Sequence, residues 1–94
     1  MAQDITVTMP SVTALAYLRA ESTDVSGRLT IWDLDASDSD PHKNNSTPFK
    51  GVGQNWTQII AILGLNTHAN RHVRIELYLD TADANLFVDC VAAF

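Results

Sequence analysis

Aromatic and charged side chains recur in several strand-like segments of this sequence. They are Tyr17, Arg19, Trp32, Arg74, Glu76 and Tyr78. Sugar recognition needs such a mixture, because aromatic rings pack against the C–H face of a pyranose while planar charged groups hydrogen-bond to neighbouring hydroxyls. The same residues could instead be core aromatics and ordinary cross-strand surface charges, and the residue types alone favour that simpler interpretation.

Asp89 is a second group that could do chemistry, because it interrupts the apolar segment LFVDCVAAF. A carboxylate buried beside Val88, Cys90 and Val91 would be costly without a cation or a hydrogen bond to neutralise it. The alternatives are that Asp89 faces solvent or caps a backbone N–H. Cys90 is the only cysteine, so no intrachain disulfide can form, and its apolar flanks predict a buried thiol.

Motifs of known catalytic chemistry are absent from the sequence, which has no Gly-x-Ser-x-Gly, no His-Glu-x-x-His and no phosphate-binding glycine loop. We therefore expect no enzyme activity. His68 and His72 are four residues apart, but they lie where a loop enters a strand, so we expect solvated histidines. The acidic run DLDASDSD does not match the spacing of an EF-hand, and it predicts a solvated loop.

The composition indicates one small globular domain over residues 1–94, with 46% hydrophobic residues and a net charge of −5. The negative charge argues against nucleic acids and anionic membranes as partners. No apolar run approaches the roughly 20 residues of a membrane-spanning helix. The segment MAQDITVTM lacks the basic and apolar regions of a signal peptide.

Alternating apolar residues predict six strands, over residues 4–9, 12–20, 28–34, 56–63, 72–80 and 86–92. The alternation is clearest in VRIELYL, where it places Arg74, Glu76 and Tyr78 on one face. For the strand that holds Trp32, a one-residue bulge would reverse the outward face. Residues 35–54 predict a long polar connection that Phe49 pins to the core.

Short strands without a helix predict an all-β, antiparallel β-sandwich that is jelly-roll-like. Six strands are few for such a fold and leave edges to be covered. We therefore expect a homo-oligomer, in which a second copy completes the sandwich.

Four segments, TALAYLRAES, RLTIWDLD, TPFKGVGQNWTQIIAIL and VRIELYLDTADANLFVDCV, resemble the later strands of the jelly-roll carbohydrate-binding modules attached to xylanases and related glycanases. Those modules carry Tyr-x-Arg-Ala-like, Trp-Thr/Ser-Gln-Val-like, Leu-Tyr-Leu-Asp and Val-Asp-Asp-Val sequences in this order. The corresponding residues here are 17–20, 56–59, 77–80 and 88–91. The resemblance covers residues 12–93 and about the last two thirds of a typical module. The first strands of the family fold have no counterpart before Asp4, and Cys90 replaces the second acid of the closing strand.

The resemblance implies non-catalytic binding of a polysaccharide or oligosaccharide and an extracellular location. The ligand-binding face would contain Trp32, Tyr78, Arg74, Glu76 and Arg19, while Trp56 would be a core residue. Asp89 would help to bind a structural calcium ion, together with backbone carbonyls from the other end of the chain. The alternative is a structural or self-assembling β-sandwich that uses the same sheet face and its edges for protein contacts.

Overall fold

The structure is a computed structural model that describes residues 2–7, 11–21, 24–37, 39–40, 43–65, 71–81 and 85–93. These residues form seven strands and no helix. The described part of the chain therefore contains no helix that could span a membrane. The strands are β1 (Ala2–Val7), β2 (Ser11–Ala20), β3 (Val25–Asp33), β4 (Asn44–Val52), β5 (Thr57–Gly64), β6 (Arg71–Leu79) and β7 (Leu86–Ala93). All six strands predicted from the sequence are confirmed within the described residues, although residues 8–9 of the first lie outside them, and β4 is additional.

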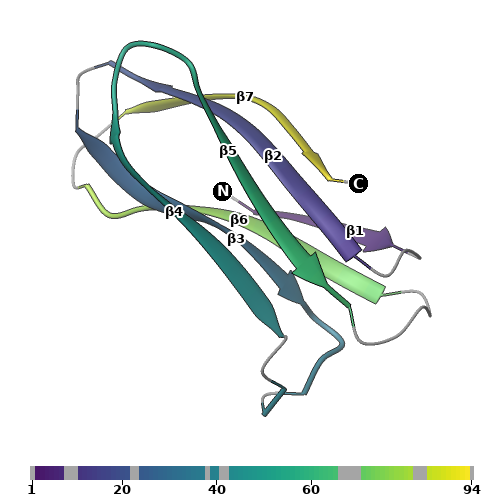
Figure 1. The fold of residues 1–94 in the computed structure, drawn as a ribbon. Coiled ribbons are helices and arrows are strands. Elements are labelled where there is room, and N and C mark those ends of the chain that lie inside the picture. Colours follow the sequence, from purple (N-terminus) through teal and green to yellow (C-terminus); the bar gives the residue numbers. More distant parts are fainter. Residues whose placement is uncertain are drawn as a thin grey trace.

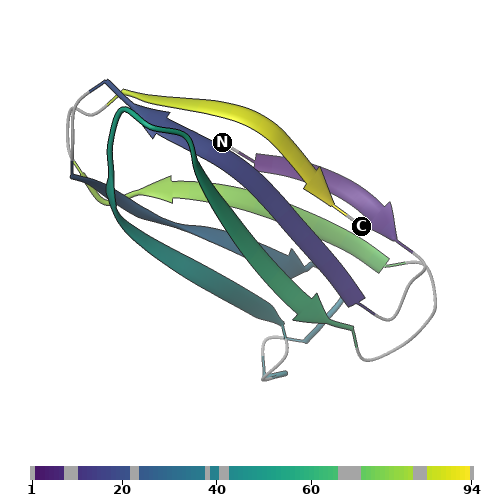
Figure 2. The ribbon, with the colours of Figure 1, turned by 45° about the horizontal axis from the view of Figure 1, so that its top comes forward.

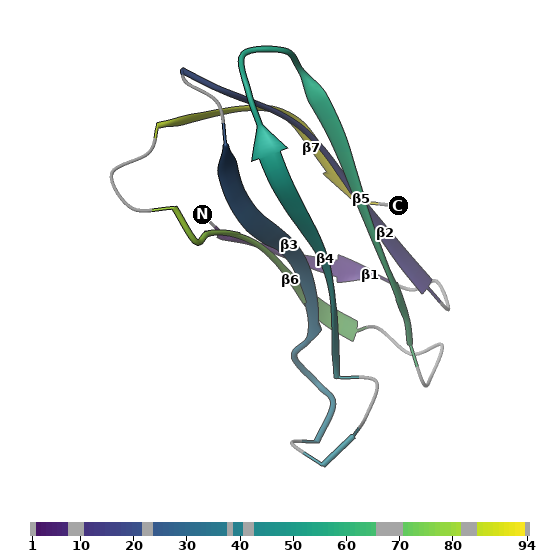
Figure 3. The ribbon, with the colours of Figure 1, turned by 60° about the vertical axis from the view of Figure 1, so that its left-hand side comes forward.

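Two antiparallel sheets face each other as a sandwich, one in the order β1-β6-β3-β4 and the other in the order β5-β2-β7 (Figure 1; Figure 3 shows the two layers from the side). Alternate residues of β2, from Val12 to Ala20, are fully buried between the layers. Leu29 and Ile31 of β3 meet them in one shared core. The predicted all-β antiparallel sandwich is confirmed.

The strands follow the path of a long hairpin that has been rolled up. The hairpin turns between β3 and β4, so β3 pairs with β4, β2 with β5 and β1 with β6. Rolling this hairpin brings β6 beside β3 and β7 beside β2. This is the path of a jelly roll, and the strand order therefore agrees with the jelly-roll-like prediction.

Strand β4 lies in the segment that was predicted to be an irregular connection, and that prediction is wrong. The sequence NNSTPFKGV lacks apolar alternation and contains Pro48, which cannot donate a ladder hydrogen bond. The strand is tolerated because β4 is the edge of its sheet, where one side needs no donor. Phe49 is buried, which confirms the prediction that it fixes this segment to the core.

Side chains of β4 close the sandwich on the side where β4 and β5 meet. Asn45 Nδ2 donates to the Ile62 carbonyl and Thr47 Oγ1 donates to the Ile60 carbonyl, each at 2.7 Å. These bonds occupy carbonyl groups of β5, the edge strand of its sheet, and they shield that edge from pairing with another chain. We call this side the β4/β5 flank.

Candidate functional site

The outward face of the four-stranded sheet gathers most of the side chains that the sequence singled out. In β3, Leu29 and Ile31 point into the core, so Trp32 points outward. The register places Trp32 directly opposite Arg74, and Arg28 directly opposite Tyr78. We call this surface the β3–β6 face, and its residues are Arg28, Trp32, Arg74, Glu76 and Tyr78, whereas Thr30 has the same parity but is buried.

Tyr78 is held from two sides on this face. The guanidinium of Arg28 lies 4.5 Å from the centroid of the Tyr78 ring, a cation–π distance. The phenol is hydrogen-bonded to the Glu76 carboxylate, and this bond, aided by desolvation, raises the pKa of Tyr78 above its ordinary value. The ring and hydroxyl are therefore positioned before any ligand arrives.

Trp32 lies beside Tyr78 and carries an unsatisfied donor. Its indole N–H is near enough to the phenol to favour the ionised form and so opposes the rise in the Tyr78 pKa. The buried Nε1 has no hydrogen-bond acceptor among the described residues. An unsatisfied buried donor costs about 1–3 kcal/mol.

Arg74 is oriented by Asp4 of the neighbouring strand β1. Arg74 Nε donates to Asp4 Oδ1 at 2.7 Å, and Nη2 donates to Oδ2 at 3.1 Å. This bidentate pair lowers the pKa of Asp4 and raises that of Arg74, in each case mainly through the side-chain hydrogen bond. The pair uses two of the five N–H donors of the guanidinium, which fixes the plane in which the others lie.

The bond between Tyr78 and Glu76 predicts how the phenol titrates. In a Tyr17→Phe background, which leaves Tyr78 as the only tyrosine, we expect ionisation above the ordinary pKa of 10.0, and Glu76→Gln should lower that pKa. Because the pKa of Tyr78 is higher in the folded than in the unfolded chain, protonated Tyr78 stabilises the fold. This contribution is complete below the unfolded pKa and is lost as the pH rises through the folded pKa. The absorbance of tyrosinate, followed against pH, measures the pKa of Tyr78. An unchanged pKa in Glu76→Gln would contradict the hydrogen bond between Tyr78 and Glu76.

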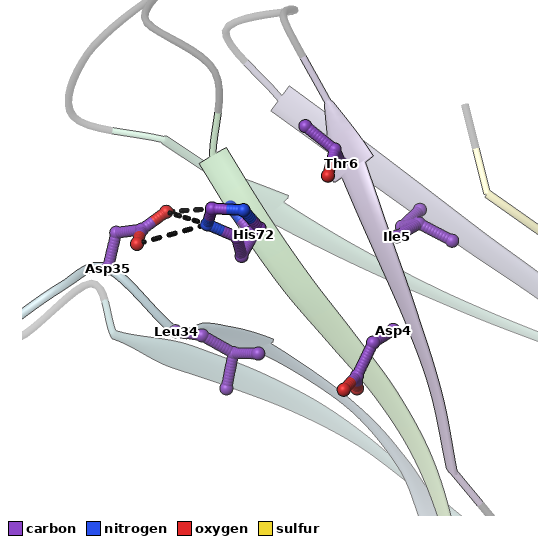
Figure 4. Close-up of a pocket in the computed structure, with 6 residues that line it drawn as sticks. All are labelled: Asp4, Ile5, Thr6, Leu34, Asp35 and His72. Atoms are coloured by element: carbon purple, nitrogen blue, oxygen red, sulfur yellow. Dashed lines mark hydrogen bonds and ion pairs between the residues drawn. The ribbon is translucent and has the colours of Figure 1, made fainter.

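An open hollow of about 440 Å³ adjoins the face at its Asp4 end, lined by Asp4, Ile5, Thr6, Leu34, Asp35 and His72 (Figure 4). Asp35 Oδ2 accepts the backbone N–H of His72 at 2.7 Å and lies 3.2 Å from the ring Nδ1. These contacts fix the segment that follows β3 to the start of β6. The hollow offers polar groups of both donor and acceptor type to a small ligand group.

The acidic run is part of the fold at its beginning, so its prediction as a solvated loop is wrong there. Asp33 is only 4% exposed, and its Oδ1 accepts the backbone N–H of Asp35 at 3.1 Å. Asp35 in turn contacts His72, whose side chain is 64% exposed, in agreement with its prediction as a solvated histidine. Asp38 and His68 lie outside the described residues. Within those residues, no group of three or more His, Cys, Asp or Glu side chains could hold a metal ion.

Arg19 is not on the β3–β6 face. It lies on the outer face of the three-stranded sheet, with its guanidinium 5.2 Å from the Trp56 ring centroid and 4.4 Å from that of Phe87. Trp56 is 50% exposed, so its prediction as a core residue is wrong. The reason is strand parity, because Ile59 and Ala61 point inward and Trp56 falls on the opposite face.

Asp89 is exposed on the same outer face, directly opposite Tyr17 in the β2–β7 register. Its carboxylate is therefore not buried among valines, and the free-energy cost of burying a carboxylate does not arise. Calcium needs six to eight oxygen ligands. Among the described residues no group of three or more His, Cys, Asp or Glu side chains forms at Asp89, and calcium there stays a prediction from the resemblance.

Two residues of these surfaces were missed in the sequence. Arg28 would have been found by pairing the two central strands, which needs their register. Phe87 would have been found from alternation in LFVDCVAA, because it has the parity of Asp89.

Comparison with protein-family models, curated proteins and solved structures finds no match for this chain. The fold and site define its class as an all-β, jelly-roll-like sandwich with an aromatic and charged sheet face.

Proposed function

We propose that this chain is a non-catalytic binding protein for a polysaccharide or oligosaccharide, and that it binds through the β3–β6 face. One observation carries the proposal: the cross-strand pairs Trp32–Arg74 and Arg28–Tyr78 share one outward face and lie on either side of Glu76. Stacking surfaces thus alternate with groups that bond to pairs of hydroxyls.

Binding on this face requires little reorganisation. Arg28 and Glu76 hold Tyr78, and Asp4 holds Arg74, so these side chains lose little conformational freedom when a ligand arrives. The hollow beside Asp4 gives a longer saccharide a place to continue past the end of the face. No covalent bond is made or broken. Arg19 is on the other sheet and is not part of this proposed site.

A second candidate function is self-assembly, and exposed apolar side chains favour it. On or beside the outer face of the three-stranded sheet, Ile62 is 55%, Trp56 50%, Ile60 44% and Phe87 40% exposed. Clusters of such residues mark interaction surfaces more often than isolated ones do. A homo-oligomer formed there would leave the β3–β6 face accessible.

Trp32→Ala should weaken the affinity for a short saccharide about tenfold or more, because a stacking surface is lost. Soluble oligosaccharides derived from xylan, β-glucan and mannan are screened first, and calorimetry then measures the tightest one. Short ligands exclude effects of multivalency. Circular dichroism checks that the variant is folded.

Trp56→Ala is the matched control, because it removes the same side chain from the opposite sheet, and we expect its affinity to equal that of the unaltered chain. The proposal is wrong if the unaltered chain binds no saccharide of the panel, or if the two tryptophan variants lose affinity equally.

A further inference from the structure

The two edges of the three-stranded sheet are treated differently. The β5 edge is covered by the bonds from Asn45 and Thr47. No comparable bond to the β7 edge is found among the described residues, and β7 pairs only with β2 there. β7 is the outermost strand of its layer on the side of β1, as Figures 1 and 2 show. We call this side the β1/β7 flank.

Strand β7 also has few of the features that keep edge strands from pairing. Its sequence, LFVDCVAA, has no lysine and no proline and carries a single charge. A register irregularity opposite Ala16 disturbs its second half, whereas residues 86–89 pair regularly with residues 17–20 of β2. The regular half is therefore a template for another strand.

Apolar side chains along the β1/β7 flank are incompletely covered. Leu86 and Val88 of β7 and Ile5 of β1 pack against the core but are only partly buried. The rolled-hairpin path explains this, because it leaves β7 without the partner that each inner strand has. A strand added beside β7 would bury these side chains further.

We propose that a second copy of this chain pairs with β7 in the antiparallel direction, with Val88 on the two-fold axis, so that two three-stranded sheets become one sheet of six strands. The axis at Val88 places Phe87 directly opposite Asp89 of the second copy. Directly opposite residues of antiparallel strands point to the same face of the sheet, so these two side chains are neighbours.

Charge complementarity selects this register. Arg19 is directly opposite Phe87 in the β2–β7 register, and its guanidinium lies over the Phe87 ring at 4.4 Å. In the proposed pairing the same row continues from Phe87 to Asp89 of the second copy. Arg19 extends along that row, and the dimer contains this pair of opposite charges twice.

The neighbouring registers are disfavoured. An axis at Asp89 would place the two Asp89 carboxylates directly opposite each other, and like charges in that position are destabilising. An axis at Phe87 would bring the two Arg19 guanidinium groups together over adjacent rings. Each of these two registers brings like charges together, whereas the axis at Val88 brings Arg19 close to Asp89 of the second copy.

This dimer does not depend on saccharide binding, because the β3–β6 face belongs to the other sheet. If both proposals are right, the dimer presents two saccharide-binding faces and gains avidity for a polymer. Loss of the dimer would leave the affinity for a short saccharide unchanged, so the failure of either proposal can be told apart from that of the other.

Sedimentation equilibrium of the full chain, with a reductant to exclude cysteine cross-links, tests the pairing. We expect a dimer, and both Arg19→Glu and Asp89→Lys should raise its dissociation constant about tenfold or more. The double variant Arg19→Glu/Asp89→Lys restores an opposite-charge pair and should return to within a few-fold of the unaltered chain.

Lys50→Glu is the matched control, because it changes the net charge as Arg19→Glu does but lies exposed on β4. Its dissociation constant should stay close to that of the unaltered chain. Circular dichroism checks each variant for folding. The proposal is overturned by a monomer at concentrations up to about 1 mM, by a dimer that both single variants leave intact, or by a double variant that is no better than the single ones.

Discussion

Gly27→Ala is expected to destabilise the sandwich by more than about 3 kcal/mol, a large fraction of the stability of a domain of this length. A Cβ at Gly27 would clash with the backbone carbonyl of Tyr78, and it would lie 2.9 Å from the Phe49 ring. The first neighbour is backbone that pairs with β3, so it cannot move without breaking the ladder between the two central strands of the sheet. The change also displaces Tyr78, and with it the β3–β6 face.

Gly64→Ala is the control, since a Cβ at Gly64 meets no atom within 4 Å. We expect its free energy of unfolding to lie within about 0.5 kcal/mol of the unaltered value. Urea denaturation followed by circular dichroism compares the two variants. Equal stability of Gly27→Ala and Gly64→Ala would show that β3 and β6 are farther apart than described.

The alternation of apolar residues was sufficient to locate most of the strands. The segment VRIELYL has period two without interruption, so the outward direction of Arg74, Glu76 and Tyr78 followed directly from the sequence. Strand β4 did not follow, because an edge strand with Pro48 is held by its neighbour and by Phe49 rather than by a pattern of its own.

Alternation could not assign a strand to a sheet. It shows which side chains leave the core, but two outward faces exist, and only the topology separates them. Arg19 and Trp32 are both outward, yet β2 and β3 belong to opposite layers. Trp56 was expected in the core from the family resemblance, and the inward direction of Ile59 and Ala61 places it outside. The candidate site therefore keeps four of its five predicted residues in one place.

Leu18→Ala is expected to cost about 2–5 kcal/mol, the second large effect. Leu18 is among the largest fully buried side chains, on the central strand of the three-stranded sheet. Truncation removes apolar contact and leaves a cavity that the flanking strands, paired on both sides of β2, cannot collapse to fill. The total stability of a domain of this length is about 5–14 kcal/mol, so this one change removes a large fraction of it.

Leu15→Ala separates burial from the loss of a leucine as such. Leu15 is on the same strand but on its outward face, where it lies opposite Ile60 and is only half-buried. We expect its cost to be about 1 kcal/mol or less. Because the two leucines lie on opposite faces of the same strand, the difference between their midpoints in urea indicates which face of β2 forms the core. Equal midpoints would mean that β2 is covered on both faces, as it would be if a homo-oligomer buried the outer face of the three-stranded sheet.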